Sequence, residues 1–237
     1  MSYAKYQDLE AGMGGLYPGQ QDQMLRWGFM RKVYGILSAQ IILTAVVASV
    51  IVLSDPLREF FTSNLNLPLA VVIALIPLFL TRPLASYHQS YPLNLLLLGL
   101  FTVALSLSVG IICALTPGII VLEALFLTAT VVMGLTVYTF YAAYRGLDFE
   151  YLGPSLIVSL TVLLIFGFIQ MFFPFGNIGS AIYGGIGALI FSLYIVFDTD
   201  NLIKRYDLDE YILASVALYL DIINLFVSIL RVLWSNN

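Results

Sequence analysis

The sequence predicts an all-α polytopic membrane protein, built as a bundle of seven transmembrane helices. Of its 237 residues, 60% are hydrophobic and 10% are charged, against about 45–50% and about 25% in soluble domains. The mean hydropathy is +0.96. A soluble fold of this size cannot bury so much apolar surface, because a large share of its residues must face water. The composition therefore excludes a soluble enzyme, a disordered chain and a nucleic-acid-binding protein.

Apolar segments of the length that crosses a bilayer, about 20 residues, recur along the chain. They cover residues 33–54, 68–87, 92–115, 118–144, 155–174, 179–203 and 211–233. Proline and glycine, which interrupt helices, separate most of them, at Asp55-Pro56, Arg82-Pro83, Tyr91-Pro92, Thr116-Pro117-Gly118, Gly153-Pro154 and residues 174–177. Pro77 lies inside the second segment and predicts a kink there, and charged residues between 204 and 210 separate the last two segments.

The beginning of the chain is expected to remain outside the membrane. Residues 1–25 are mostly polar and lack the short apolar core of a cleavable signal peptide. We therefore expect a polar cytosolic tail at residues 1–32 and a transmembrane domain at residues 33–237. The single cysteine, Cys113, cannot form an intramolecular disulfide, and no Cys/His cluster predicts a metal cofactor.

Basic residues predict the orientation, because loops on the cytosolic side of a membrane are enriched in lysine and arginine. A cytosolic N-terminus places eight basic residues on the cytosolic side: Lys5, Arg26, Arg31, Lys32, Arg82, Arg145, Lys204 and Arg205. The other side then holds only Arg58 and Arg231. We therefore expect a cytosolic N-terminus, and seven crossings would place the C-terminus outside.

Acidic residues inside the predicted spans are the functional candidates, because an ionisable group in a membrane costs a few kcal/mol. Asp221 lies in the middle of the last span, Asp198 near the cytosolic end of the sixth, and Glu123 in the first turns of the fourth. Asp221 belongs to a helical stripe of small or polar residues: Ala214, Ala217, Asp221, Asn224 and Ser228. The preceding span has a matching stripe: Gly184, Gly187, Phe191, Tyr194 and Asp198. Such stripes face a bundle interior or a water path, although small residues also serve tight helix packing.

Asp198 and Asp221 lie on consecutive helices and could meet inside the bundle. Two close carboxylates cannot both ionise cheaply, so the pair is expected to titrate as a unit near physiological pH. Counted from the 204–210 loop, Asp221 lies about five residues deeper, roughly 7.5 Å at the helical rise. Helix tilt or uneven loop ends must therefore bring the two carboxyl groups to one level.

Four further residues are weaker candidates. Asp200 lies on another face than Asp198, so we expect it to reach headgroup water or to pair with Lys204 four residues on. Arg82 ends the second span at the level of Asp198; it could bind that carboxylate or serve as an interfacial anchor. Asn224 could support the acid pair, and Glu123 could equally be an acid at headgroup level.

Several stretches resemble the transmembrane Bax inhibitor motif family, and most closely its plant LIFEGUARD branch. They are LRWGFMRKVYGIL from Leu25, NLLLLGLFTVALSLSVG from Asn94, VLEALFLTATVV from Val121, YTFYAAYRGLDFEYLGP from Tyr138, YIVFDTDNLIKR from Tyr194 and LYLDIINLFVSILR from Leu218. The last two stretches are the most specific. The chain departs from many relatives at Asp200, where they carry glutamine, and it lacks the basic C-terminal tail of the Bax inhibitor branch.

The resemblance implies a seven-helix bundle with a central seventh helix, and a pH-sensitive calcium leak linked to suppression of cell death. It implies that Asp198 and Asp221 form the pH sensor in the ion path, where they would ligate calcium transiently, and that Arg82 is the latch of a closed state. Calcium is then the permeating ion and no cofactor is needed. The endoplasmic reticulum or another endomembrane is the expected location, with the plasma membrane as the alternative.

Other functions remain open at this point. A non-conducting adaptor could regulate cell death by binding other membrane proteins, with the acids serving stability alone. An intramembrane aspartyl protease also needs two acids on neighbouring helices, but its Gly-x-Gly-Asp signature is absent, since Asp221 follows Leu218-Tyr219-Leu220. A proton-coupled transporter is not favoured, because the chain has no evident inverted repeat. We expect no enzymatic activity.

Overall fold

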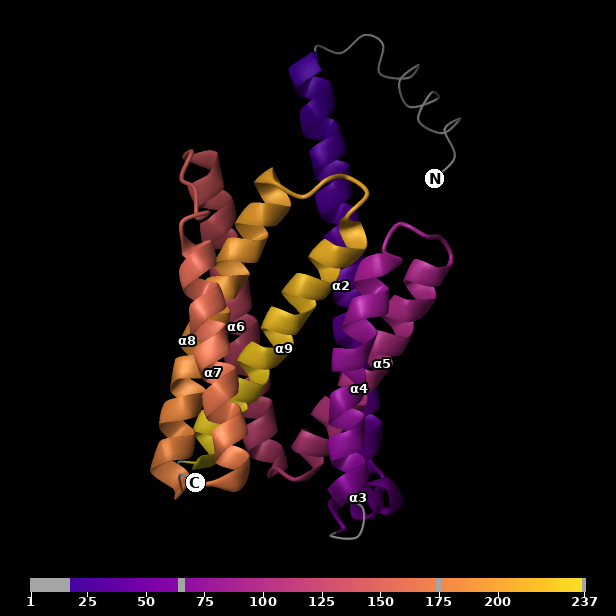
Figure 1. Cartoon of the computed structure of the whole chain (residues 1–237), viewed down its shortest axis with the longest axis vertical. Helices are drawn as coiled ribbons and strands as arrows, with labels where there is room; N and C mark the ends of the chain where they lie inside the picture. Colours follow the sequence, from indigo (N-terminus) through magenta and orange to yellow (C-terminus); the bar gives the residue numbers. More distant parts are fainter. Residues whose placement is uncertain (1–17, 64–66, 174–175, 236–237) are drawn as a thin grey trace.

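The computed structural model describes residues 18–63, 67–173 and 176–235, and within these ranges its regular secondary structure is helical (Figure 1). The helices are α2 (Pro18–Leu53), α3 (Asp55–Thr62), α4 (Leu67–Ser86), α5 (Leu93–Ala114), α6 (Gly118–Tyr144), α7 (Leu152–Phe172), α8 (Gly176–Lys204) and α9 (Tyr211–Ser235). The predicted all-α class is confirmed for the described residues.

Six of these helices are long and apolar enough to cross a membrane: α2 from Gln23 onward, α5, α6, α7, α8 and α9. The described apolar stretch of α4, Val71–Ser86, is shorter than a span, and α4 contains Pro77 and Pro83. The chain is therefore a multi-pass membrane protein, and a seventh crossing by α4 stays a prediction.

Helix α2 begins earlier than the first predicted span. No proline interrupts the chain between Pro18 and Leu53, and proline itself is favoured in the first turn of a helix. Phe29 and Met30 are buried, so the bundle already includes residues before the expected boundary at residue 32. Residues 1–17, which make up much of the predicted tail, lie outside the described residues.

The Asp55-Pro56 break ends α2 as predicted, but it also begins another helix. Asp55 and Pro56 occupy the first turn of α3, where an acid and a proline both suit a helix N-terminus. The sequence predicts only a connection here. Helix α3 carries Arg58, which donates from Nε to the carbonyl oxygen of Ala114 at 3.3 Å.

Helix α9 occupies the middle of the bundle. It packs against α2, α5, α6 and α8, and it runs obliquely between a group formed by α6, α7 and α8 and another formed by α2, α4 and α5 (Figure 1). Its Tyr219 belongs to the larger hydrophobic core with Phe101 of α5, whereas its Leu225 packs with Leu163 and Phe191 in a second core. The central position expected for the last helix is therefore observed.

Glycines let α8 and α9 approach closely. A Cβ atom on Gly184 would lie 2.8 Å from the carbonyl oxygen of Ser228, and one on Gly187 would lie 2.8 Å from the Ser228 hydroxyl. Both glycines are buried, and both belong to the predicted small-residue stripe. The contact of the two helices therefore depends on the absence of side chains here.

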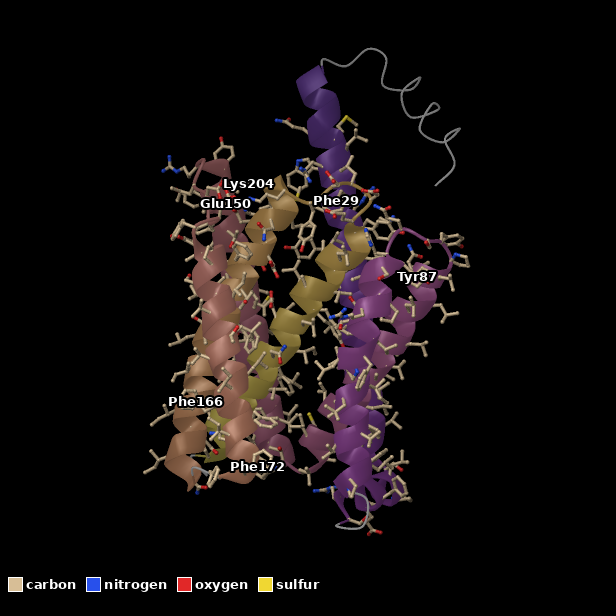
Figure 2. The ribbon with its side chains drawn as sticks, viewed as in Figure 1. Phe29, Tyr87, Glu150, Phe166, Phe172 and Lys204 are labelled. Carbon is tan, nitrogen blue, oxygen red and sulfur yellow. The ribbon has the colours of Figure 1, made fainter. Side chains whose placement is uncertain are left out.

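The outer faces of the helices explain the high hydrophobic content. Phe79, Phe126 and Ile178 are each at least 75% exposed. Phe166 and Phe172 point outward from α7 (Figure 2). Such surfaces are stable only against lipid, since water would not tolerate so extended an apolar face.

Candidate functional site: the acid pair and its ion-pair network

Asp198 of α8 and Asp221 of α9 face each other, and their carboxyl groups interact at hydrogen-bonding range. Asp198 lies six residues before the end of α8 at Lys204, and Asp221 lies ten residues after the start of α9 at Tyr211. Helix α9 runs obliquely across the bundle (Figure 1), and the two carboxyl groups interact despite this difference in sequence depth. The juxtaposition of the two predicted acids is thus present in the structure.

The surroundings of the two acids differ. Asp221 is buried, with 6% of its surface exposed, and its Oδ2 atom has no hydrogen-bond donor among the described residues. Asp198 is partly exposed, and its Oδ1 atom accepts a hydrogen bond from the Asn201 side chain at 3.4 Å. The inner member of the pair, Asp221, therefore has one oxygen without a donor, and the outer member, Asp198, is hydrogen-bonded to Asn201 near the end of α8.

Tyr206, in the 205–210 loop, lies close enough to both acids for their charges to act on its phenol, although no sequence pattern marks it. Burial raises the pKa of its phenol, and the nearby charges of Asp198 and Asp221 act in the same direction. The phenol therefore stays protonated at physiological pH. Its position follows from the fold of the loop, which the hydrophobic pattern does not predict.

Asn201 connects the acid pair to a second polar cluster. Its Nδ2 atom donates to Asp198, and its Oδ1 atom accepts a hydrogen bond from Arg205 Nη1 at 2.6 Å. Arg205 Nη1 also lies 3.1 Å from Asp200 Oδ2. One amide side chain thus separates the Asp198 carboxyl group from an arginine.

Asp200 is the centre of this second cluster. It is fully buried, and its Oδ1 atom lies 2.5 Å from Lys204 Nζ. Its Oδ2 atom also accepts a hydrogen bond from the backbone N–H of Phe149 at 3.2 Å. Of the two environments expected for Asp200, the structure forms the pair with Lys204, and the expectation of headgroup water is wrong. Arg205 and the connection between α6 and α7 close over the carboxylate and exclude water.

The same two cations bind the connection between α6 and α7. Lys204 donates to the carbonyl oxygen of Leu147, and Arg205 forms an ion pair with Asp148 and a longer one, 3.6 Å, with Glu150. Glu150 and Lys204 lie at the same end of the bundle (Figure 2). The backbone N–H of Glu150 and the Arg205 guanidinium lower the pKa of the Asp148 carboxyl. Residues 147–150 are therefore attached to Lys204 and Arg205 at the end of α8, the helix that carries Asp198.

Helix α2 reaches this end of the bundle as well. Arg26 donates from Nη1 to the carbonyl oxygen of Tyr206 at 2.5 Å and from Nη2 to that of Lys204 at 3.3 Å. Arginine near the C-terminus of a helix satisfies carbonyl groups that lack partners within the helix. The end of α8 is therefore bonded both to α2 and to the connection between α6 and α7.

Arg82, Glu123 and Asn224 form no hydrogen bond or ion pair with either acid among the described residues. Arg82 is exposed at the end of α4, and no ion pair between it and Asp198 occurs among the described residues. Glu123 is exposed on α6. Asn224 donates to the carbonyl oxygen of Leu220 in its own helix at 2.8 Å. The latch role of Arg82 therefore stays a prediction for another conformation.

A buried hydrogen-bond network across α2, α5 and α9 escaped the sequence analysis. The hydroxyls of Thr44 and Tyr219 lie 2.7 Å apart, and Ser106 donates to Thr44 at 3.0 Å. Gln40 donates to Thr102 at 3.0 Å. These residues lie on three separate helices, so the sequence does not predict that they meet. Their spacing within each helix could predict only that they share the buried face of that helix.

The acid pair by itself does not make a closed metal site. Calcium in proteins takes about six to eight oxygen ligands. Among the described residues, no three His, Cys, Asp or Glu side chains gather in a way that could hold a metal ion. Two carboxyl groups in contact can share a proton, or present their oxygens to a cation whose remaining ligands are water.

Comparisons with known proteins identify the family. A family model described as inhibitor of apoptosis-promoting Bax1 matches residues 26–237. The chain is 56% identical over 230 residues to the BI1-like protein of Arabidopsis thaliana, covering 95% of this chain and 89% of that protein. Protein LIFEGUARD 4 of the same plant is 53% identical over 231 residues, covering 95% and 94%. The Golgi anti-apoptotic protein of vaccinia virus (strain Lister) is 35% identical over 213 residues, covering 90% and 87%. The chain therefore belongs to the Bax inhibitor family and to its LIFEGUARD branch.

Proposed function

We propose that the protein is a pH-sensitive calcium leak in a cellular membrane, gated by Asp198 and Asp221. The observation that carries this proposal is the contact of two carboxyl groups between neighbouring membrane helices. A carboxylate at such a depth is costly to maintain for packing alone. Small residues or amide side chains would allow the two helices to pack at a lower free-energy cost.

The orphaned oxygen of Asp221 supports a shared proton. A buried carboxylate oxygen without a donor is unfavourable by several kcal/mol at most sites, and Oδ2 of Asp221 is such an atom. A single proton between the two carboxyl groups would remove one negative charge and the repulsion between them. The state with the two groups in contact is then the protonated state.

Loss of that proton changes the site. Two charged carboxylates repel each other in a medium of low dielectric constant, and each then exposes hard oxygen ligands that suit calcium. Rings or pairs of acids also favour cations over anions in a pore. This change would reach the connection between α6 and α7 through two hydrogen bonds, one from Asn201 to Asp198 and one from Arg205 to Asn201.

Suppression of cell death is proposed as the biological role. The family description names an inhibitor of apoptosis-promoting Bax1, and the viral relative is named as a Golgi anti-apoptotic protein. The second name also favours an endomembrane location. Expression of the chain in cells challenged with a death-inducing Bax protein tests the role, and co-localisation of a fluorescent fusion with Golgi and endoplasmic reticulum markers tests the location.

Calcium flux into liposomes tests the leak directly. Purified full-length protein is reconstituted with a calcium dye inside the vesicles, and the initial rate is measured across a series of pH values. We expect a rate above that of empty vesicles, with a single sigmoidal dependence on pH. Absence of flux at every pH would reject the leak and favour an adaptor that binds other membrane proteins.

A further inference from the structure

The end of the bundle opposite the acid pair contains an arginine that has no acidic partner among the described residues. Arg231, in the last turns of α9, is half-buried, and its guanidinium lies 4.5 Å from the centroid of the Tyr183 ring. Its Nη2 atom donates to the side-chain oxygen of Gln170 at 2.5 Å. Both partners are neutral. The ion pairs of the described residues gather around Lys204 and Arg205, and none of them includes Arg231.

A cavity of about 540 Å³ lies beside this arginine. It opens between α5, α8 and α9, so its walls come from both groups of helices. Its polar wall consists of Arg231 with Asn177, Ser180 and Ser235, and its apolar wall includes Ile112 and Val227. Trp234 also lines it. No carboxylate among the described residues lines the cavity, so none of them balances the positive charge of Arg231 there.

The chemistry of the cavity selects an anion with an apolar part. A partly buried charge is costly unless a group of opposite sign pairs with it. The planar guanidinium of arginine binds phosphate oxygens through two parallel hydrogen bonds. The side chains of Ser180 and Asn177 add donors for the same oxygens, whereas the Ser235 hydroxyl already donates to the carbonyl oxygen of Val232 at 2.9 Å. The apolar wall in turn matches a glycerol backbone and acyl chain better than it matches a free ion.

We propose that this cavity binds the phosphate headgroup of an anionic membrane lipid, with Arg231 as the phosphate ligand. Both the ends of membrane helices and lipid phosphates lie at the membrane–water interface. A zwitterionic headgroup fits less well, because its cationic part finds no carboxylate in the lining. A lipid held here would contact α5 on one side and α8 and α9 on the other.

Trp234 provides a direct readout of occupancy. The chain has two tryptophans, and Trp27 lies at the other end of the bundle, so Trp27→Phe leaves Trp234 as the only reporter. The full-length variant is reconstituted in phosphatidylcholine vesicles that contain either brominated phosphatidic acid or brominated phosphatidylcholine at the same mole fraction. We expect stronger quenching of Trp234 by the brominated phosphatidic acid.

Arg231→Gln in the same background should remove this preference, with a fall of about tenfold or more in relative affinity for one lost charge-assisted contact. Arg58→Gln is the matched control, because Arg58 lies at the same end but donates to the Ala114 carbonyl. It should keep the preference. Equal quenching by the two lipids in the parent, or equal losses in both arginine variants, would overturn the proposal.

Two further arms separate the remaining explanations. Val227→Phe retains Arg231 but fills the cavity, so it should also abolish the preference, and it replaces Arg231→Gln if that variant fails to fold. An unchanged preference in Val227→Phe would show that the lipid binds elsewhere and would reject the cavity. Inorganic phosphate is added to the parent in a third series. A response of Trp234 emission to inorganic phosphate, with no preference between the two brominated lipids, would assign the cavity to a free anion and reject the lipid.

Discussion

Three aspartates at the end of α8 and in α9 occupy three different environments. Asp221 is buried with one oxygen lacking a donor, Asp198 is partly exposed and bonded to Asn201, and Asp200 is fully buried between two cations. Replacing aspartate by a neutral residue therefore removes a different set of interactions at each position. The resulting phenotypes should separate gating from stability.

Asp221→Asn should weaken calcium flux, because one hard oxygen charge is lost from the proposed path. It should also move the pH midpoint of the remaining flux downward, because Asp198 would then ionise without a like charge beside it. The measurement is liposome calcium flux against pH. Asp207→Asn is the control, since Asp207 is exposed in the 205–210 loop and should leave the midpoint in place. A midpoint that moves only in the control would show that the wrong acids have been paired.

Asp200→Ala should reduce the free energy of unfolding by about 3 kcal/mol, near the lower end of the range for breaking a buried ion pair. The lower end applies because Lys204 and Arg205 are partly exposed and regain water. Unfolding of the detergent-solubilised protein, followed by circular dichroism, measures the change. Asp148→Asn, at an exposed partner of the same arginine, should have little effect. Equal stability of the two variants would contradict the central role of Asp200.

At the scale of elements, the contact of α8 with α9 decides how close the two acids come. Gly184→Ala should destabilise the protein by about 1–3 kcal/mol, the range for overpacking a close contact. The added Cβ would meet the Ser228 carbonyl at 2.8 Å and the Val232 backbone nitrogen at 3.2 Å. Backbone atoms cannot move aside as a flexible side chain does, so the helices must separate.

Gly185→Ala is the matched control for this change. A Cβ at Gly185 meets nothing within 4 Å, and alanine favours a helix over glycine by about 1 kcal/mol. Thermal unfolding should therefore show a lower midpoint for Gly184→Ala and an equal or higher one for Gly185→Ala. The opposite order would mean that the glycine stripe does not set the distance between α8 and α9.

At the scale of the whole molecule, the ends of the helices fall into two groups. The contacts of Arg26 with residues 204–206, and of Gln89 with Asp209, place the start of α2, the α4–α5 connection and the 205–210 loop together. The start of α8 and the end of α9 lie at the other end (Figure 1). This grouping agrees with the split of basic residues along the chain, and the membrane side of each group is a prediction.

Cysteine labelling tests this topology. Cys113 is buried, and Cys113→Ala provides a background without thiols. Met24→Cys and Asp207→Cys should react with an impermeant reagent from the cytosolic side, and Ile178→Cys should react only from the opposite side. The three native residues are exposed. Labelling of positions 24 and 207 from opposite sides would reject both the topology and the site built on it.

The class of the protein, the approximate extent of most helices and the identity of the acids can all be predicted from the amino-acid sequence. The boundaries of α6 agree with the prediction at both ends, because the hydrophobic length of a span and its proline and glycine breaks are local properties. The separation of Asp200 from the face of Asp198 was also predictable, since each residue turns a helix by about 100°.

The groups that these residues contact depend instead on how the helices pack against one another. Periodicity assigns a side chain to a face of its own helix, but it contains no information on the tilt or depth of the neighbouring helix. The oblique course of α9 brings Asp221 to Asp198, the folded connection between α6 and α7 buries Asp200, and α4 leaves Arg82 exposed and apart from the pair. The free energies behind these arrangements come from packing between helices distant in the sequence, which no local pattern records.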